Sequence, residues 1–245
     1  MDLTAKTALV TGGAKRIGRA VATALAAAGA DVIVHYNTSA DEADDLAGTL
    51  RRTGRKAWTL QADLAEPEQA DALMGRAVEL AGAVDVLVNN ASIFPKSRLA
   101  DFSPAHLAEN LNLHAVAPLL LGRRLAAQGR AGAIVNMLDC RIAAYDRTHA
   151  AYHLSKRALL SLTRMMALDF APAVRVNAVA PGLILPPPGE DPAFLQRLVD
   201  HNPMKRHGSA EGVADAVVYL IGADFVTGQV IFVDGGYHLR GAADV

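Results

Sequence analysis

The sequence is poor in cysteine, in long apolar runs and in net charge. Its single cysteine, Cys140, rules out a disulfide bond within the chain and is more typical of a small packed residue than of a reactive thiol. No apolar run reaches the roughly 20 residues that span a membrane, and no basic region precedes a hydrophobic stretch at the N-terminus. The formal net charge of -1 argues against a nucleic-acid surface. We therefore expect a cytoplasmic protein that binds neither membranes nor nucleic acid.

The composition is that of a compact domain, with 51% apolar and 20% charged residues. Short apolar runs alternate with helical patterns, and no linker or internal repeat interrupts them. This alternation is typical of right-handed βαβ units. It predicts a single Rossmann-type, doubly wound α/β domain over residues 1–245, with a seven-stranded parallel sheet. The expected strands are Thr7–Val10, Asp31–Tyr36, Lys56–Gln61, Val84–Asn89, Ala133–Leu138, Arg175–Val179 and Gln229–Val233.

A glycine-rich segment, Thr11–Gly18, separates the first expected strand from a helical pattern at Arg19–Ala28. Glycines in such a turn let backbone amides approach a pyrophosphate, and the N-terminus of the following helix favours its negative charge. Because the segment lies between a strand and a helix, it predicts a dinucleotide site rather than a simple connection. We expect Gly12, Ile17 and Gly18 to contribute to this site.

The second strand ends at His35-Tyr36-Asn37, about twenty residues after the glycines. A carboxylate there would bind the ribose of NAD and repel the 2′-phosphate of NADP. None is present, and nearby donors and cations favour NADP. Ser39 and Glu42 also fit a capping box at the same helix start. Asp41 is a carboxylate that could reach back toward the ribose, but its position inside the first helical turn is less favourable for that contact. The residues expected at this end of the cofactor are Lys15, Arg16, His35, Tyr36, Asn37 and Ser39.

Further polar or small residues follow three other strands, at the sheet edge where ligands bind in this fold. Asp63 and Leu64 follow the third strand, where the carboxylate could accept from an adenine amino group or act in the N-cap region of the next helix. These two interpretations stay open. Beside the expected path of the cofactor we place Asn90, Ala91, Pro181 and Gly182.

The segment from Asp139 to Lys156 contains the candidate catalytic group. Tyr152 and Lys156 are four residues apart in a helical pattern, so they share a face. An ammonium ion near a phenol favours the phenolate, and lowering a tyrosine pKa from about 10 to about 7 takes roughly 4 kcal/mol. Such a tyrosine is a useful proton donor near neutral pH. Asp139 ends an apolar strand and is expected to emerge at the ligand-binding edge.

Four motifs occur in order along the chain: Thr11–Gly18, Asn89–Ala91, Tyr152-x-x-x-Lys156 and Pro181-Gly182. Together they resemble the short-chain dehydrogenase/reductase family over essentially the whole length. Three residues depart from that family's usual pattern. Arg16 replaces a small residue of the glycine turn, Asp139 replaces the catalytic serine, and His114 replaces an asparagine of the middle helix.

Arg16 and Asp139 resemble the pteridine reductase branch of this family. The ending Asp234–Arg240, with His114, is most similar to bacterial dihydromonapterin reductases. The resemblance implies an NADPH-dependent reductase whose members are usually homotetramers, with no metal site. It implies catalytic roles for Asp139, Tyr152 and Lys156. On the substrate side it implies Arg16, Ser92, Phe94 (stacked on a pterin), Asp139, Tyr152 and Leu183.

The departure at Asp139 is chemically coherent with this interpretation. A serine helps to hold a ketone oxygen as negative charge develops, whereas a carboxylate would repel it. A pterin offers N–H donors, which a carboxylate accepts well, and Tyr152 could then supply or relay a proton to the ring nitrogen. We expect reduction of 7,8-dihydromonapterin, dihydrofolate or dihydrobiopterin. The alternatives are a ketone reductase, for example of a 3-oxoacyl thioester, and a non-catalytic NADP sensor. His114 is more typical of a satisfied core residue than of a proton relay.

A proline-rich segment after the sixth strand is expected to cover the substrate. Leu183–Gly189, with prolines at 186–188, leads into a short helical pattern at Pro192–Val199. A stiff turn before a small helix suits a lid over residues 183–208, although an ordinary connection is the alternative. Ser209 is expected to cap a helix to Ile221. The candidate pocket walls are Leu185, Phe194 and Leu198.

Overall fold

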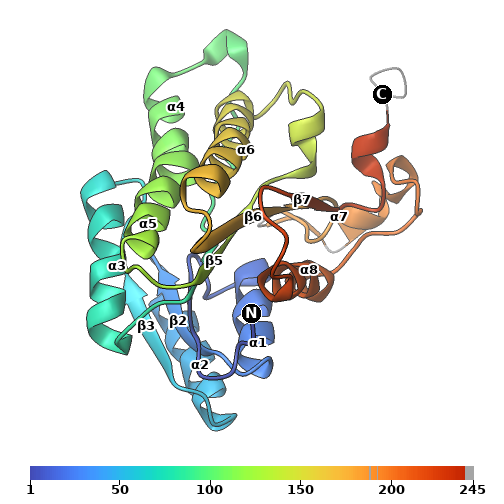
Figure 1. Cartoon of the computed structure of the whole chain (residues 1–245). Coiled ribbons are helices and arrows are strands. Elements are labelled where there is room, and N and C mark those ends of the chain that lie inside the picture. The colour runs from blue at the N-terminus through green and yellow to red at the C-terminus, as the bar shows by residue number, and fades with distance from the viewer. Residues whose placement is uncertain (188, 192, 241–245) are drawn as a thin grey trace.

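A computed structural model shows seven parallel strands in one sheet with helices on both faces (Figure 1). The structure describes residues 1–187, 189–191 and 193–240. The strands lie in the order β3-β2-β1-β4-β5-β6-β7, which confirms the predicted Rossmann-type fold. They are β1 (Thr7–Val10), β2 (Asp31–Tyr36), β3 (Ala57–Gln61), β4 (Val86–Asn89), β5 (Gly132–Met137), β6 (Val174–Pro181) and β7 (Val230–Val233).

The helices divide the core into layers on the two sides of the sheet. One layer packs α1, α2 and α8 against the strands, and the other packs α3 and α5 against the opposite face. The α-helices are α1 (Arg16–Ala27), α2 (Ala40–Arg52), α3 (Pro67–Ala81), α4 (Pro104–Leu111), α5 (Ala117–Ala126), α6 (Ala150–Asp169), α7 (Ala193–Gln196) and α8 (Ala210–Gly222). Short 3₁₀ turns are η1 (Leu99–Asp101), η3 (Cys140–Ala143), η4 (Val199–His201) and η5 (Tyr237–Leu239), and η2 (Asn112–Val116) is a π-turn.

The central strands are buried on both faces. Every residue of β1, β4 and β5 is buried, which explains why these strands are continuous apolar runs rather than alternating ones. Chain order reverses between β1 and β4, which pair in parallel. In open α/β sheets the crevice outside the carboxyl ends of strands at such a switch point binds ligands. The fold therefore places the candidate site at the ends of β1, β4, β5 and β6.

Two local predictions need correction. Ser39 occupies the N-cap of α2, but its side chain accepts no hydrogen bond there, and Glu42 pairs with Lys15 instead. The predicted capping box is therefore wrong, because the lysine of the glycine turn competes for the glutamate. The helix expected at Pro192–Val199 is the shorter α7 followed by η4. Pro188 and Pro192 lie outside the described residues.

Other local predictions are confirmed. Ser209 caps α8, with its Oγ accepting from the Gly212 amide at 3.1 Å. Cys140 is buried, and burial raises the pKa of its thiol. Leu159, Thr163 and Met166, which share the helical face of the candidate catalytic pair, are also buried.

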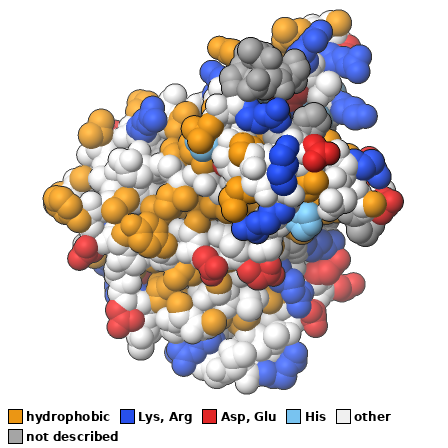
Figure 2. Space-filling model, turned by 90° about the vertical axis from the view of Figure 1, so that its right-hand side faces the viewer, with side chains coloured by type: hydrophobic (Ala, Val, Ile, Leu, Met, Phe, Trp, Pro, Cys, Tyr) orange, Lys and Arg blue, Asp and Glu red, His pale blue; other side chains and the backbone are white. Residues whose placement is uncertain are grey.

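Hydrophobic side chains gather on the side of the molecule that faces the viewer in Figure 2, where α8 and β7 lie. Two large ones near these elements are strongly exposed: Tyr219 at 60% and Phe225 at 101%. A partner subunit would cover such side chains, and the homotetramer stays a prediction. Within the described part of the chain, no helix combines the length and apolarity needed to cross a membrane.

Candidate active site

The glycine turn between β1 and α1 is packed so closely that side chains would not fit. A Cβ added at Gly18 would lie 2.2 Å from the Gly12 carbonyl oxygen, and one at Gly12 would lie 2.9 Å from the Ala91 Cα. Gly12 also has a φ of +59°, a conformation that glycine adopts without strain. These two predicted residues thus let α1 approach β1 and β4, with the N-terminus of α1 directed at the sheet edge.

Side chains from β1 and the end of β4 tie this turn in place. The Asn90 Nδ2 donates to the carbonyl oxygens of Thr11 at 2.9 Å and Gly12 at 3.0 Å. The Thr11 Oγ1 accepts from the Asn90 and Ala91 amides at 2.8 and 3.0 Å. The predicted Asn90–Ala91 pair therefore supports the turn. The role of Thr11 was missed, since a threonine ending a strand gives no distinctive signal.

His35 holds the same turn from the neighbouring strand. Its Nδ1 accepts from the Gly12 amide at 3.1 Å, so its Nε2 carries the proton and donates to the Ala62 carbonyl at 3.1 Å. Burial lowers the pKa of His35 to about 4, which keeps the ring neutral. We predicted His35 among the cofactor residues. With both nitrogens bonded to the protein backbone, its effect on a nucleotide would pass through the glycine turn.

The residues expected near the 2′-phosphate lie in the turn after β1 and at the end of β2. The Lys15 Nζ pairs with the Glu42 carboxylate at 2.6 Å, and both side chains are about half exposed. An exposed pair of this kind is weak, so Lys15 can exchange it for a phosphate. The Asn37 oxygens accept from Gln61 at 3.3 and 3.4 Å. Tyr36 is partly buried against the core, and Ser39 lies at the start of α2.

The Asp63 carboxylate accepts from the Ala65 amide at 2.9 Å, just before α3. This contact is a local turn before the helix, the second of the two interpretations left open. It uses one carboxylate oxygen and leaves the adenine interpretation untested. Leu64 is buried, so its side chain belongs to the core.

Asp139, Tyr152 and Lys156 meet at the carboxyl end of β5. The Tyr152 hydroxyl donates to Asp139 Oδ2 at 3.0 Å, while Asp139 Oδ1 accepts from the Arg141 amide at 2.8 Å. The Lys156 Nζ donates to the Met137 carbonyl at 2.7 Å and lies 5.6 Å from the centre of the Tyr152 ring. The structure therefore brings the three predicted catalytic residues together.

The proton affinity of Tyr152 differs from the prediction. Burial first, and then the negative charge of Asp139, raise the pKa of Tyr152 well above its usual value of 10.0. Burial lowers the pKa of Lys156 to about 8. The expectation of a tyrosine pKa near 7 is wrong in direction, because the phenol is buried and hydrogen-bonds to a carboxylate. Tyr152 is a neutral hydrogen-bond donor whose proton already points at Asp139.

A cavity of about 180 Å³ opens beside this group. It joins the glycine turn, the β4 and β5 ends and the segment after β6. The Pro181-Gly182 turn borders it, and a Cβ at Gly182 would lie 2.6 Å from the Asp234 Cβ, so only glycine fits there. The lining residues are Arg16, Ile17, Asn90, Ser92, Met137, Leu138, Asp139, Tyr152, Lys156, Pro181, Gly182, Ile184 and Leu185.

Most of these lining residues were predicted, but Met137, Leu138 and Ile184 were not. Their aliphatic side chains resemble any core residue in sequence. In the part of the chain that the structure describes, the predicted substrate residue Leu183 and the predicted wall residues Phe194 and Leu198 do not line the cavity. The Leu183 carbonyl instead accepts from the Gly208 amide at 2.9 Å, which closes the base of the predicted lid.

Phe94 lies next to the cavity rather than in its wall. Its ring meets the Tyr152 ring edge-on, with centroids 4.7 Å apart, and stacks on the His149 ring at 3.8 Å. Phe94 stays 40% exposed. The predicted place for a flat substrate beside Phe94 is therefore bordered by a second aromatic ring that the sequence did not reveal.

His114, on the π-turn η2, is fully bonded within the core. Its Nε2 accepts from the Ile93 amide at 3.2 Å and lies 3.0 Å from Ser92 Oγ. Its Nδ1 donates to Ser155 Oγ at 2.8 Å, and that hydroxyl donates to the Tyr152 carbonyl at 2.7 Å. Burial, and secondarily the Lys156 charge, lower the pKa of His114 well below 6.5. This neutral ring supports the predicted core role.

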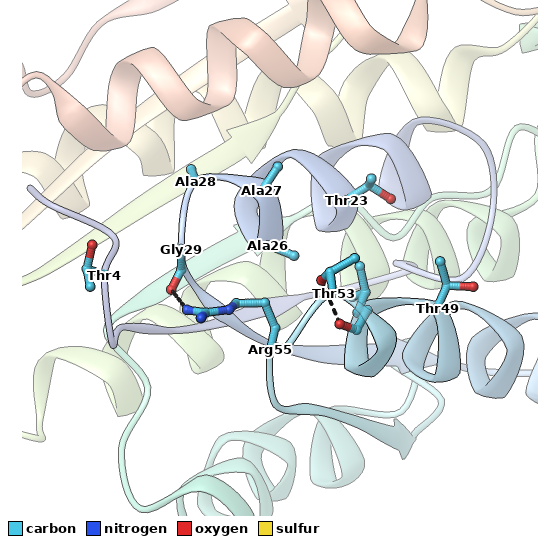
Figure 3. A pocket seen from close by; sticks show the side chains of 10 residues that line it. Thr4, Thr23, Ala26, Ala27, Ala28, Gly29, Thr49, Thr53 and Arg55 are labelled. Atoms are coloured by element: carbon cyan, nitrogen blue, oxygen red, sulfur yellow. Dashed lines mark hydrogen bonds between the residues drawn. The ribbon is translucent and has the colours of Figure 1, made fainter.

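A larger hollow, of about 690 Å³, lies at the opposite edge of the sheet between α1 and α2 (Figure 3). The hydroxyls of Thr23, Thr49 and Thr53 donate to backbone carbonyls at 2.7 to 3.0 Å, and the Arg55 guanidinium donates to the Gly29 carbonyl at 2.9 Å. These contacts hold helix and strand ends. Size alone therefore does not mark the functional site, whose reactive groups surround the smaller cavity.

The family described as enoyl-(acyl carrier protein) reductase matches residues 12–238. The chain belongs to the short-chain dehydrogenase/reductase family, as its motifs predicted. It is 37% identical to a ketoacyl reductase ascribed to the granaticin polyketide synthase of Streptomyces violaceoruber, over 96% of this chain and 97% of that one.

Two solved structures carry further information. FolM alternative dihydrofolate reductase 1 from Brucella suis, in complex with NADP, superposes with a TM-score of 0.93 at 33% identity and covers 100% of both chains. A blue fluorescent protein from a metagenomic library, in complex with NADPH, gives a TM-score of 0.89 at 34% identity and covers 97% of this chain and 99% of that one. The predicted NADP cofactor agrees with what these two structures contain.

Proposed function

We propose that this protein is an NADPH-dependent reductase of a dihydropterin, with 7,8-dihydromonapterin as the favoured substrate and dihydrofolate and dihydrobiopterin as related candidates. The observation that carries the proposal is the hydrogen bond from Tyr152 to Asp139, in the position where a serine is usual in this family. The proposal includes a homotetramer, as the family resemblance implies, and a cytoplasmic location, as the composition leads us to expect.

The cofactor side of the site fits a dinucleotide. The glycine turn leaves no room for side chains, and the cavity reaches from that turn past Asn90 to Pro181-Gly182. Arg16, Lys15 and Asn37 are the side chains that would hold the phosphates of the dinucleotide. NADPH bound along this path supplies the hydride.

The other side of the site supplies a proton and an acceptor. The Asp139 carboxylate can accept N–H groups of a pterin, a role that it already performs for the Tyr152 hydroxyl. Tyr152 is protonated at neutral pH, so it can pass its proton to the ring nitrogen of a C=N bond. The Lys156 ammonium, held by the Met137 carbonyl, then offsets the negative charge left on the phenol oxygen.

The comparisons support this proposal unequally. The alternative dihydrofolate reductase from Brucella suis covers the whole chain, which favours pterin chemistry. The ketoacyl reductase relative favours the second candidate, reduction of a ketone such as a 3-oxoacyl thioester. A carboxylate next to the reacting carbon disfavours that reaction, since it opposes the developing alkoxide. The assembled Tyr152–Lys156 pair disfavours a non-catalytic NADP sensor.

Steady-state turnover separates the three. Purified protein is mixed with NADPH and each of the three dihydropterins or a 3-oxoacyl thioester, and NADPH loss is followed at 340 nm with product chromatography. We expect turnover of a dihydropterin, and a drop of roughly 100-fold or more in Tyr152→Phe with NADPH binding unchanged. Activity on the thioester alone, increased by Asp139→Ser, would establish the ketone reductase. Tight NADPH binding without any turnover would establish the sensor.

A further inference from the structure

We propose that Asp146 is a positioning residue, which holds His149 and Arg141 against Phe94 and so fixes the aromatic ring beside the cavity on which a flat substrate stacks. The inference rests on the proposed pterin function and extends it to the loop between η3 and α6. It assigns separate tasks to the two oxygens of one buried carboxylate.

The first oxygen of Asp146 folds the loop. Oδ1 accepts from the Thr148 amide at 2.7 Å, the Thr148 hydroxyl at 2.8 Å and the His149 amide at 3.0 Å. The Asp146 side chain is only 5% exposed. Burial alone would raise the pKa of Asp146, but hydrogen bonds from Thr148 and Arg141 lower it well below its usual value. The carboxylate is therefore ionised at any pH at which the enzyme works.

The second oxygen reaches the groups that flank Phe94. Oδ2 accepts a short hydrogen bond from the Arg141 guanidinium and one from His149 Nδ1 at 3.1 Å. The His149 ring lies 3.8 Å from the Phe94 ring at an interplanar angle of 16°, and the Arg141 guanidinium carbon lies 5.3 Å from the Phe94 centroid. One oxygen atom thus contacts both neighbours of this ring, and His149 Nδ1 also lies 2.9 Å from the Thr148 hydroxyl.

Phe94 connects this cluster to the chemistry. Its edge-on contact with Tyr152, at 4.7 Å and 86°, fixes its distance from the proton donor. Phe94 remains 40% exposed although the His149 ring stacks on it. An open aromatic surface next to a proton donor suits a planar heterocycle, and stacking of this kind depends on a fixed ring orientation.

The loop has a second attachment that does not involve Oδ2. The Ser97 amide donates to the Thr148 carbonyl at 2.8 Å, and the Ala150 amide donates to the Ser97 carbonyl at 2.8 Å. The Ala151 amide donates to Ser97 Oγ at 3.0 Å. These bonds join the Phe94 loop to the start of α6. Loss of the Oδ2 contacts alone should therefore leave the loop folded and free the rings.

Asp146→Asn makes this separation, because its amide retains an oxygen for the Oδ1 contacts and presents an NH₂ group in place of Oδ2. The Arg141 contact is then lost, and His149 keeps one only as the tautomer whose Nδ1 accepts. We expect the KM for the dihydropterin to rise roughly 5- to 10-fold, as expected for a lost stacking contact, with kcat and the NADPH dissociation constant changed less than about twofold. Asp169→Asn, the same substitution at an exposed residue at the end of α6, is the matched control. It should leave KM, kcat and the NADPH dissociation constant unchanged.

His149 variants complete the test. His149→Ala should raise KM by a similar factor, and His149→Phe, which keeps the stacked ring, by less than about twofold. The double variant Asp146→Asn/His149→Ala should be little worse than His149→Ala alone, because the His149 contact is shared and only the Arg141 contact is lost in addition. Binding of oxidised biopterin to the NADP⁺-loaded protein, measured by pterin fluorescence, should follow the same order.

The outcomes distinguish this inference from the proposed function. No turnover of any dihydropterin by the wild-type protein overturns the proposed function. Turnover with an unchanged KM in Asp146→Asn, or with fully multiplicative effects in the double variant, overturns the positioning role alone. A fall in kcat, a rise in KM and a fall in NADPH affinity of similar size in Asp146→Asn would also overturn it, since they would indicate a general role in folding.

Discussion

The two sides of the site are built differently. On the cofactor side, backbone atoms and buried side chains define the shape: Gly18 packs on Gly12, and Asn90 and His35 bond to the same turn. On the substrate side, side chains from separate surface loops define it, as in the contact of Phe94 with His149.

This difference affects what substitution can do. A turn held by backbone packing tolerates almost no added atoms and fails as a unit. A wall held by side-chain contacts can change its shape one residue at a time, which allows related reductases to keep one cofactor and differ in substrate. The cofactor side should therefore show few, large effects, and the substrate side smaller and more selective ones.

The largest effect should come from Gly18→Ala. The new Cβ would lie 2.2 Å from the Gly12 carbonyl oxygen and 2.6 Å from Asn90 Nδ2, and the first of these is a backbone atom that cannot turn aside. We expect NADPH affinity to fall roughly 100-fold, the upper range for forced overpacking. The NADPH dissociation constant can be measured by titrating each protein with NADPH and following the fluorescence of the cofactor.

Gly75→Ala in α3 is the matched control. A Cβ there meets nothing within 4 Å, and alanine favours the helix, so the free energy of unfolding should rise by about 0.5–1 kcal/mol with NADPH affinity unchanged. If both alanine variants bind NADPH as the wild type does, the close packing of the glycine turn is not what shapes the cofactor site.

His35 should make the cofactor side sensitive to acid. Its folded pKa of about 4 lies below its ordinary value of 6.5, so its contribution to stability is complete above pH 6.5 and is lost as the pH falls toward 4. Between pH 7 and pH 5 this loss is roughly 2 kcal/mol. Urea unfolding measures the free energy of unfolding at both pH values. Its decrease from pH 7 to pH 5 should be smaller in His35→Gln than in the wild type by about that amount. An identical drop in the two proteins would contradict the neutral, turn-holding role of His35.

The sequence predicts well both the fold and the side chains that meet at the end of β5, because both depend on local patterns. Apolar runs alternate with helical periodicity, and the i, i+4 spacing of Tyr152 and Lys156 places them on one face wherever the helix lies. The glycine turn is recognisable for the same reason, since its residues are adjacent in the chain.

The remaining features depend on contacts between distant residues. The bond between His35 and Gly12, and the stack of His149 on Phe94, join segments whose separation in sequence gives no signal. The sign of the Tyr152 pKa shift was wrong for a related reason. Spacing shows that a lysine is nearby, but only the structure shows that the carboxylate of Asp139 is bonded to the phenol and opposes its ionisation.

An effect of intermediate size should appear in the pH dependence of activity, because Lys156 and Tyr152 lose their protons at different pH values. The pKa of Lys156, lowered by burial to about 8, predicts that its ammonium is lost above pH 8, whereas Tyr152 stays protonated. We expect kcat/KM to fall roughly tenfold per pH unit above 8, since only the charged lysine can offset a phenolate. Absorbance at 295 nm should show no phenolate assignable to Tyr152, by difference from Tyr152→Phe, up to pH 9. A tyrosine that titrates near 7 would restore the original prediction.

The smallest effect concerns Arg16, the residue that joins the two sides. Its backbone has a φ of +55°, and its guanidinium donates to the Pro186 carbonyl at 2.7 Å, across from the glycine turn to the segment after β6. A non-glycine residue in this conformation costs about 1 kcal/mol. The strain is retained where a glycine would relieve it, which indicates that the side chain has a use.

Arg16→Gly should therefore stabilise the protein against urea by about 1 kcal/mol while raising the KM for the substrate roughly threefold or more. Ala5→Gly, at a φ of +58° in a turn before β1, is the control and should gain similar stability without any change in KM. The opposed changes in Arg16→Gly would show that the link between the two sides is maintained at the expense of stability. A variant that gains stability and keeps its KM would show that the cofactor and substrate sides of the site are not connected through Arg16.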